Sequence, residues 1–137
     1  MTTKYDSSWM LGRPIVDVDI ADSYQWRFFF ERGLSIGIEC PWRLLKDGCM
    51  AISSEDHLQQ YGLPAPIDAV AVAKDLLAPH LITRVEIRDG TADLLIELTG
   101  DLRLEAIPFS RGYESWNVFG PSGFQVVAQG GGHLCVW

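Results

Sequence analysis

Long apolar runs are missing from this chain of 137 residues. No stretch approaches the roughly 20 apolar residues that a membrane-spanning helix needs. The first residues, MTTKYDSSWML, also lack the apolar core of a signal peptide. We therefore expect a cytoplasmic protein without a membrane partner.

Motifs for metal, phosphate or redox chemistry are missing as well. The chain has no Cys-x-x-Cys or His-x-x-x-His pair, and Gly130–Gly132 lies between predicted strands rather than before a helix. The three cysteines, Cys40, Cys49 and Cys135, have no paired spacing and do not predict a disulfide framework. We expect no metal, no cofactor and no catalytic residue. Folding could still assemble a Cys-His site, and His133 with Cys135 is the pair for that alternative.

Basic residues are few, because 11 Lys and Arg face 18 Asp and Glu and give a net charge of −7. Nucleic acid is therefore not an expected partner, since phosphate binding needs clustered cations. The charge favours a basic protein partner, because opposite charges steer association. Solubility alone would also explain the acidity.

The clearest positive signal is the stretch from Ile82 to Ile107, ITRVEIRDGTADLLIELTGDLRLEAI. Apolar residues alternate with polar ones, and Asp89-Gly90 and Gly100-Asp101 interrupt the alternation. Such a pattern is typical of half-buried strands joined by tight turns. It predicts an antiparallel meander of three strands.

A similar pattern occurs about 67 residues earlier, from Ile15 to Glu39. Trp42 and Trp116 extend the match, so that each copy would hold five strands. We predict a single domain, 1–137, with pseudo-repeats at about 15–53 and 82–128. Any two meanders share alternation and turn glycines, so coincidence is one alternative. Structural recurrence without common ancestry is another.

A helical insert at about 54–79 separates the two copies. Ser53 or Ser54 is a suitable N-cap for a short helix that ends at Gly62. The run from Ile67 to Ala78 has one apolar stripe and predicts the main helix. The expected fold class is α+β: two meanders form a curved sheet or partly closed barrel, and this helix packs on it.

Apolar residues also fall on the polar face of the predicted strands. Phe29 and Leu95 occupy equivalent positions in the two copies and point away from the expected core. Large apolar groups there need a cover, which could be the helix, the other half of the sheet or a second subunit. A homodimer is therefore one hypothesis.

The tail holds the candidate binding residues Tyr113, Glu114, Trp116 and His133. Aromatic residues beside an acid are typical of interface anchors. Core packing is the competing interpretation, above all for Trp116, whose counterpart Trp42 recurs in the first copy.

The same tail resembles a family of small bacterial proteins that is known only as a domain of unknown function. The resemblance consists of a Tyr-Glu-x-Trp strand and a closing Gly-Gly-x-Leu-x-Val-Trp. The matching residues are Tyr113, Glu114, Trp116, Gly131, Gly132, Leu134, Val136 and Trp137. The resemblance implies no activity. Loosely, small acidic β-rich proteins of this kind are similar to immunity proteins of toxin systems.

Two functional hypotheses follow. The first is a non-catalytic protein-binding module, such as an immunity-type inhibitor of a basic partner. The alternative is a small-ligand-binding protein or a cryptic enzyme, with a pocket near the C-terminal strands.

Overall fold

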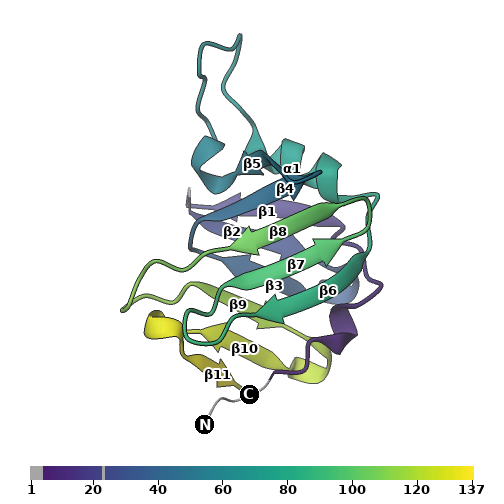
Figure 1. Cartoon of the computed structure of the whole chain (residues 1–137), viewed down its shortest axis with the longest axis vertical. Helices are drawn as coiled ribbons and strands as arrows, with labels where there is room; N and C mark the ends of the chain where they lie inside the picture. Colours follow the sequence, from purple (N-terminus) through teal and green to yellow (C-terminus); the bar gives the residue numbers. More distant parts are fainter. Residues whose placement is uncertain (1–4, 23) are drawn as a thin grey trace.

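Eleven antiparallel strands in the described part of the chain form two stacked sheets (Figure 1). The computed structural model describes residues 5–22 and 24–137. Sheet A has the order β1 (Asp17–Ala21), β2 (Gln25–Phe29), β3 (Ser35–Ile38), β9 (Trp116–Phe119), β10 (Gln125–Ala128) and β11 (Leu134–Val136). Sheet B has the order β5 (Cys49–Ser53), β4 (Trp42–Lys46), β8 (Leu102–Ala106), β7 (Leu94–Leu98) and β6 (Ile82–Ile87).

This architecture confirms the prediction of a β-rich α+β fold and revises its shape. The expected curved sheet or partly closed barrel is instead a pair of sheets, neither of which closes. The reason lies at two short connections, 39–41 and 107–115, where the chain leaves one sheet and enters the other. Proline stands in both, at Pro41 and Pro108, and cannot donate the backbone hydrogen bond that would continue a ladder.

The two halves of the chain exchange strands between the sheets. The meander β1-β2-β3 lies in sheet A and the hairpin β4-β5 follows it in sheet B, whereas β6-β7-β8 lies in sheet B and β9-β10 in sheet A. Pairing of β3 with β9 and of β4 with β8 joins the halves. This strand order is the one expected if each half were a five-stranded unit that places three strands in one sheet and two in the other. The internal repeat itself stays a prediction.

Large aromatic side chains fill the space between the sheets. Trp42 of sheet B meets Trp26 and Phe28 of sheet A edge-on, at ring-centroid distances of 4.8 and 5.2 Å. Trp116 is fully buried, and its indole N–H donates to the carbonyl oxygen of Ala92 at 2.7 Å. This bond ties sheet A to the loop between β6 and β7. The Trp42 indole N–H, equally buried, has no hydrogen-bond partner among the described residues.

The main helix, α1 (Ala69–Leu77), closes one edge of the sandwich. The sequence predicts this helix at 67–78. The carboxylate of Asp68 caps it by accepting from the Ala71 N–H at 3.1 Å. Ala69, Ala73 and Leu77, spaced four apart, are fully buried where the helix contacts β1 and β5. Small alanines on this face let the helix approach both sheets closely.

The segment before α1 differs from the expected short helix. Only a 3-10 turn, η3 (Ser54–Asp56), forms there, with a capping box between Ser53 and Asp56. His57 and the residues after it leave the helical conformation, and Leu58 has a left-handed backbone with φ 65°. Other 3-10 turns are η1 (Ser8–Met10), η2 (Glu31–Gly33), η4 (Pro121–Gly123) and η5 (Gly130–Gly132).

The two buried tryptophans provide a test of the tie between the sheets. Trp116→Phe is expected to lower the free energy of unfolding by about 1–3 kcal/mol more than Trp42→Phe, because only the first leaves a buried carbonyl without its donor. Both variants lose the same ring volume. Urea unfolding of the two variants and the parent measures the difference, and equal losses would contradict a stabilising role for the bond.

Candidate functional site

The predicted tail residues do not converge on one cavity. Trp116 is fully buried and serves the core, whereas Tyr113 is 78% exposed. The Glu114 carboxylate accepts from the Asn117 side-chain amide at 3.2 Å. His133 is exposed just before β11, beyond the pairing of Ala128 with Leu134. A binding role for Tyr113, Glu114 and His133 stays a prediction.

A shallow hollow of about 240 Å³ lies on the outer face of sheet A, lined by residues of β1, β2, β3 and β9. Gly37 makes it possible, because a Cβ there would lie 2.8 Å from the side-chain oxygen of Asn117. That Oδ1 is buried and has no hydrogen-bond partner among the described residues. Asp19 and Arg27 lie on the walls. The hollow therefore presents both a carboxylate and a guanidinium to a small ligand.

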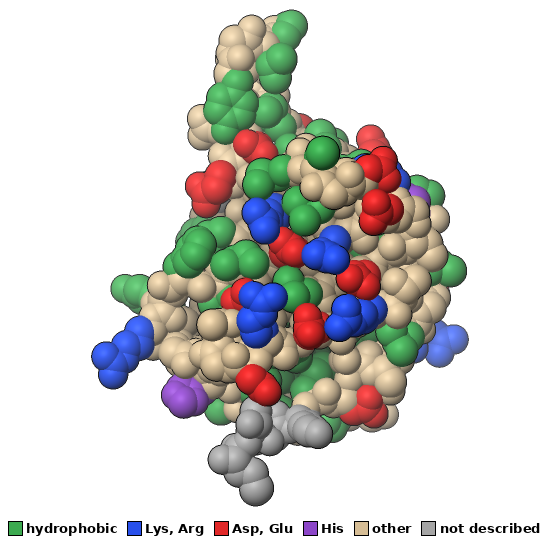
Figure 2. Space-filling view, in the orientation of Figure 1, with side chains coloured by type: hydrophobic (Ala, Val, Ile, Leu, Met, Phe, Trp, Pro, Cys, Tyr) green, Lys and Arg blue, Asp and Glu red, His purple; other side chains and the backbone are tan. Residues whose placement is uncertain are grey.

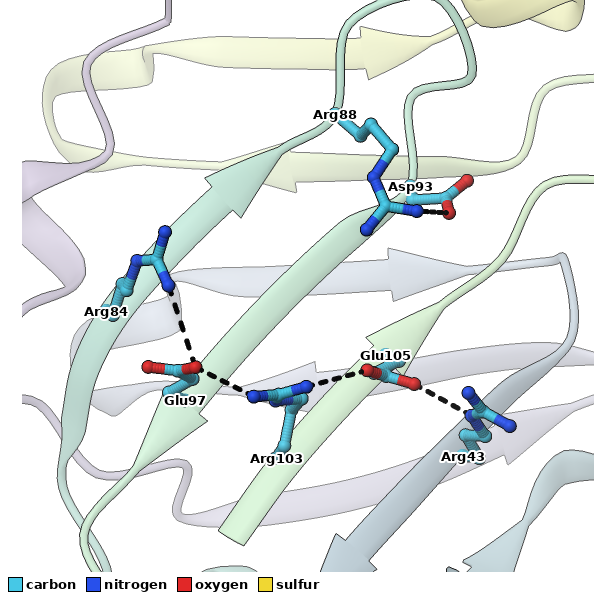
Figure 3. A network of polar contacts seen from close by, with 7 residues as sticks. All are labelled: Arg43, Arg84, Arg88, Asp93, Glu97, Arg103 and Glu105. Atoms are coloured by element: carbon cyan, nitrogen blue, oxygen red, sulfur yellow. Dashed lines mark hydrogen bonds and ion pairs between the residues drawn. The ribbon is translucent and has the colours of Figure 1, made fainter. Parts of the chain in front are cut away.

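Sheet B carries a chain of ion pairs across its outer face (Figure 3). Arg103 lies between Glu97 at 3.0 Å and Glu105 at 3.4 Å. Glu105 also accepts from Arg43 at 2.7 Å, and Arg84 reaches Glu97 at 3.7 Å. The hydrogen bond to Glu105 raises the pKa of Arg103 above its ordinary value, so this cation stays charged.

Glu105 is the centre of this network, because its side chain is only 8% exposed and bonds two arginines. Arg88 pairs separately with Asp93 at 3.2 Å. Cations and carboxylates alternate over the whole face (Figure 2), so they balance one another. The outer face of sheet B therefore has little net charge to offer a partner.

The ion pairs also bear on the apolar residues of the outer faces. Leu95 is half-buried among Arg84, Arg88 and Arg103. Long arginine stems can cover apolar surface while their charged ends stay in water. Phe29 is half-buried beside the hollow of sheet A. The homodimer stays a prediction.

Unpaired carboxylates remain in excess elsewhere. Six Lys and Arg form ion pairs with six carboxylates within the described residues. The chain has 18 carboxylates, so twelve of them have no ion pair within the described part. Among the 11 cations, the described residues without an ion pair there are Arg13, Arg27, Arg32 and Arg111. Lys4 lies outside the described residues. These carboxylates lie outside the ion-pair network on the outer face of sheet B.

Several of these unpaired carboxylates lie on the edge that α1 closes. We call Asp19, Glu55, Asp56, Asp68 and Asp75, from β1, η3 and α1, the acidic edge. The ring of His57 joins two of its parts, because its Nδ1 accepts from the Ala69 N–H at 3.1 Å. On the same edge Lys74 pairs with Asp17 at 3.1 Å, and this contact lowers the pKa of Asp17. Sequence periodicity missed this grouping, because β1, η3 and α1 are distant in the chain.

The three cysteines differ in exposure: Cys49 is exposed, and Cys40 and Cys135 are half-buried. Burial raises the pKa of Cys40 to about 12, which keeps it a protonated, unreactive thiol at neutral pH. All three cysteines are free. No group of three His, Cys, Asp or Glu in the described part of the chain could hold a metal ion. Within the same residues, no helix is long and apolar enough to cross a membrane.

The ion-pair network can be tested with matched charge-neutral variants. Glu105→Gln is expected to destabilise the fold by about 1–3 kcal/mol, because it leaves two arginines without their shared carboxylate. Glu86→Gln removes the same charge from a side chain that is 46% exposed, and is expected to cost less than about 0.5 kcal/mol. Thermal and urea unfolding measure both. Equal effects would show that Glu105 is not central to the face.

Comparison with known proteins adds no relative. Neither a protein-family model nor a curated protein nor a solved structure matches this chain. The function is therefore argued from the surface of the chain itself.

Proposed function

We propose that this protein is a non-catalytic protein-binding module that engages a basic partner, in the manner of an immunity-type inhibitor. One observation supports this function above the others: five carboxylates without ion pairs in the described part of the chain lie on the acidic edge, while the cations of sheet B are neutralised within the fold. A partner with clustered Lys and Arg would be attracted to this edge.

Such charges act mainly on the rate of association. Exposed pairs contribute only about 0–1 kcal/mol each, because water and salt screen them. Together, however, like charges on one edge raise the encounter rate with an oppositely charged surface. The acidic edge would therefore select and orient a basic partner, and tight binding would need apolar contacts in addition.

Carbodiimide cross-linking, which joins carboxylates to lysines, tests this function. In extracts of the source cells we expect adducts from Asp19, Glu55 or Asp75 to one lysine-rich protein. Once that protein is purified, its association rate with the chain is expected to fall about tenfold or more between low and high salt.

Matched variants separate the acidic edge from net charge. Asp19→Asn, Glu55→Gln and Asp75→Asn together are expected to slow association about tenfold. The control combines Glu31→Gln, Asp89→Asn and Asp101→Asn, which remove the same number of charges from turns elsewhere. Equal slowing by both sets, or binding that salt does not affect, would contradict the proposal.

Small-ligand binding is the second candidate, because the hollow of sheet A has a volume of about 240 Å³ and is lined by the charged side chains of Asp19 and Arg27. A small ligand with an N–H or O–H group is expected to shift the amide resonances of residues 37 and 117. Gly37→Ala should abolish the shift, because its methyl group would meet Asn117 Oδ1 at 2.8 Å. A polar-fragment screen by NMR without hits at these residues would count against this candidate.

A further inference from the structure

Residues 58–67 form an arm that projects beyond the two sheets (Figure 1). The chain leaves the body after η3 and returns at the start of α1. Two backbone hydrogen bonds close the base: the Leu58 N–H donates to the Ile67 carbonyl, and the Ile67 N–H donates to the Gln59 carbonyl, both at 2.8 Å. The tip is closed by the Leu63 N–H, which donates to the Gln60 carbonyl at 2.7 Å. The arm is thus a structured hairpin-like loop.

The arm carries large apolar side chains that the body of the protein does not cover. Leu58 and Tyr61 are each 65% exposed, and Leu63 is 47% exposed. Figure 2 shows apolar side chains along the projecting segment. Single exposed apolar residues are ordinary, but a group of them on a projection is typical of a binding element.

The conformation of the arm is restrained before any partner binds. Leu58 and Tyr61 hold left-handed backbone angles, with φ 65° and 47°. Pro64 and Pro66 each fix a further backbone angle. The Tyr61 hydroxyl donates to Asp56 at 3.1 Å, and this bond raises the pKa of Tyr61, so the phenol stays protonated. A restrained loop loses less conformational entropy on binding than a flexible one.

The surroundings of the arm are acidic. No Lys or Arg occurs between Lys46 and Lys74, a stretch that contains the whole arm. Glu55, Asp56 and Asp68 stand at its base, and Figure 2 shows acidic side chains where the arm leaves the body. An anionic lipid surface would repel this base, whereas a protein cleft bordered by Lys and Arg would complement it.

We propose that the arm inserts Leu58, Tyr61 and Leu63 into an apolar cleft of a protein partner whose rim carries Lys and Arg. The rim cations would meet the carboxylates at the base of the arm. This inference rests on the proposed function and deepens it, because it supplies the apolar anchor that an acidic surface alone lacks. A large aromatic and two leucines in a desolvated cleft are the kind of group that dominates binding energy.

Photo-cross-linking with the full chain tests the inference. With p-benzoylphenylalanine in place of Tyr61, irradiation of the source cells is expected to join the chain to a single partner. The same group in place of Phe109, which is 80% exposed and lies outside the arm, is the control and is expected not to react with that partner. No adduct at position 61, or adducts only between copies of the chain, would overturn the inference.

The cross-linked partner is then purified and titrated. Leu58→Asn, Tyr61→Asn and Leu63→Asn together are expected to weaken binding at least tenfold, and asparagine tolerates the left-handed backbone at the first two positions. Phe109→Ser is the matched control and is expected to bind as the parent does. If the unfolding midpoint of the triple variant falls, the binding affinity of the single variant Leu63→Ser is measured instead. A smaller loss of affinity is expected for it, and parent-like affinity would overturn the inference.

The outcomes distinguish this inference from the proposed function. If the triple arm variant binds as tightly as the parent, while Asp19→Asn, Glu55→Gln and Asp75→Asn slow association, the arm inference is overturned and the function stands. If binding depends on the arm but neither on salt nor on those carboxylates, the basic rim and the basic partner are overturned. Arm-dependent sedimentation with vesicles of phosphatidylcholine and phosphatidylglycerol would overturn a protein partner.

Discussion

The pairing of β3 with β9, and of β4 with β8, is the constraint on which the rest of this structure depends. Each ladder joins a three-stranded meander from one half of the chain to strands from the other half. Without these two ladders, each half of the chain would form only a meander whose apolar face is exposed to water. With them, Trp26 and Phe28 in one sheet and Trp42 in the other enclose a common core.

That arrangement leaves the two sheets with different surfaces. On sheet B, antiparallel register places Arg103 next to Glu97 and sets Arg43 opposite Glu105, so the charges satisfy one another. On sheet A the equivalent area is a hollow over Gly37, where the Asn117 amide oxygen has no hydrogen-bond partner among the described residues. Five carboxylates without ion pairs in the described part of the chain lie instead on the acidic edge, at the side that α1 closes.

The arm and the acidic edge divide the tasks of recognition between them. Carboxylates act over a distance comparable to the Debye length, about 8–10 Å in physiological salt, and so affect encounter. Apolar side chains act only in contact, and so affect the lifetime of a complex. The turn η3 leads directly into the arm, and the hydrogen bond of His57 joins η3 to the start of α1. The position of the arm relative to the acidic edge is therefore fixed.

Local pattern determined much of this protein. Alternation in Leu94, Ile96 and Leu98 predicted strands, and the stripe through Ala69, Ala73 and Leu77 predicted the helix, because period and side-chain burial are local properties. The excess of Asp and Glu over Lys and Arg also follows from the sequence alone. Only the tertiary structure decided that the strands form two sheets rather than one, since alternation does not say which strands pair. It also decided that residues 58–67 form a projecting arm, and that Trp116 lies in the core. The grouping of the acidic edge arises from contacts of α1 with β1 and β5, which no local spacing specifies.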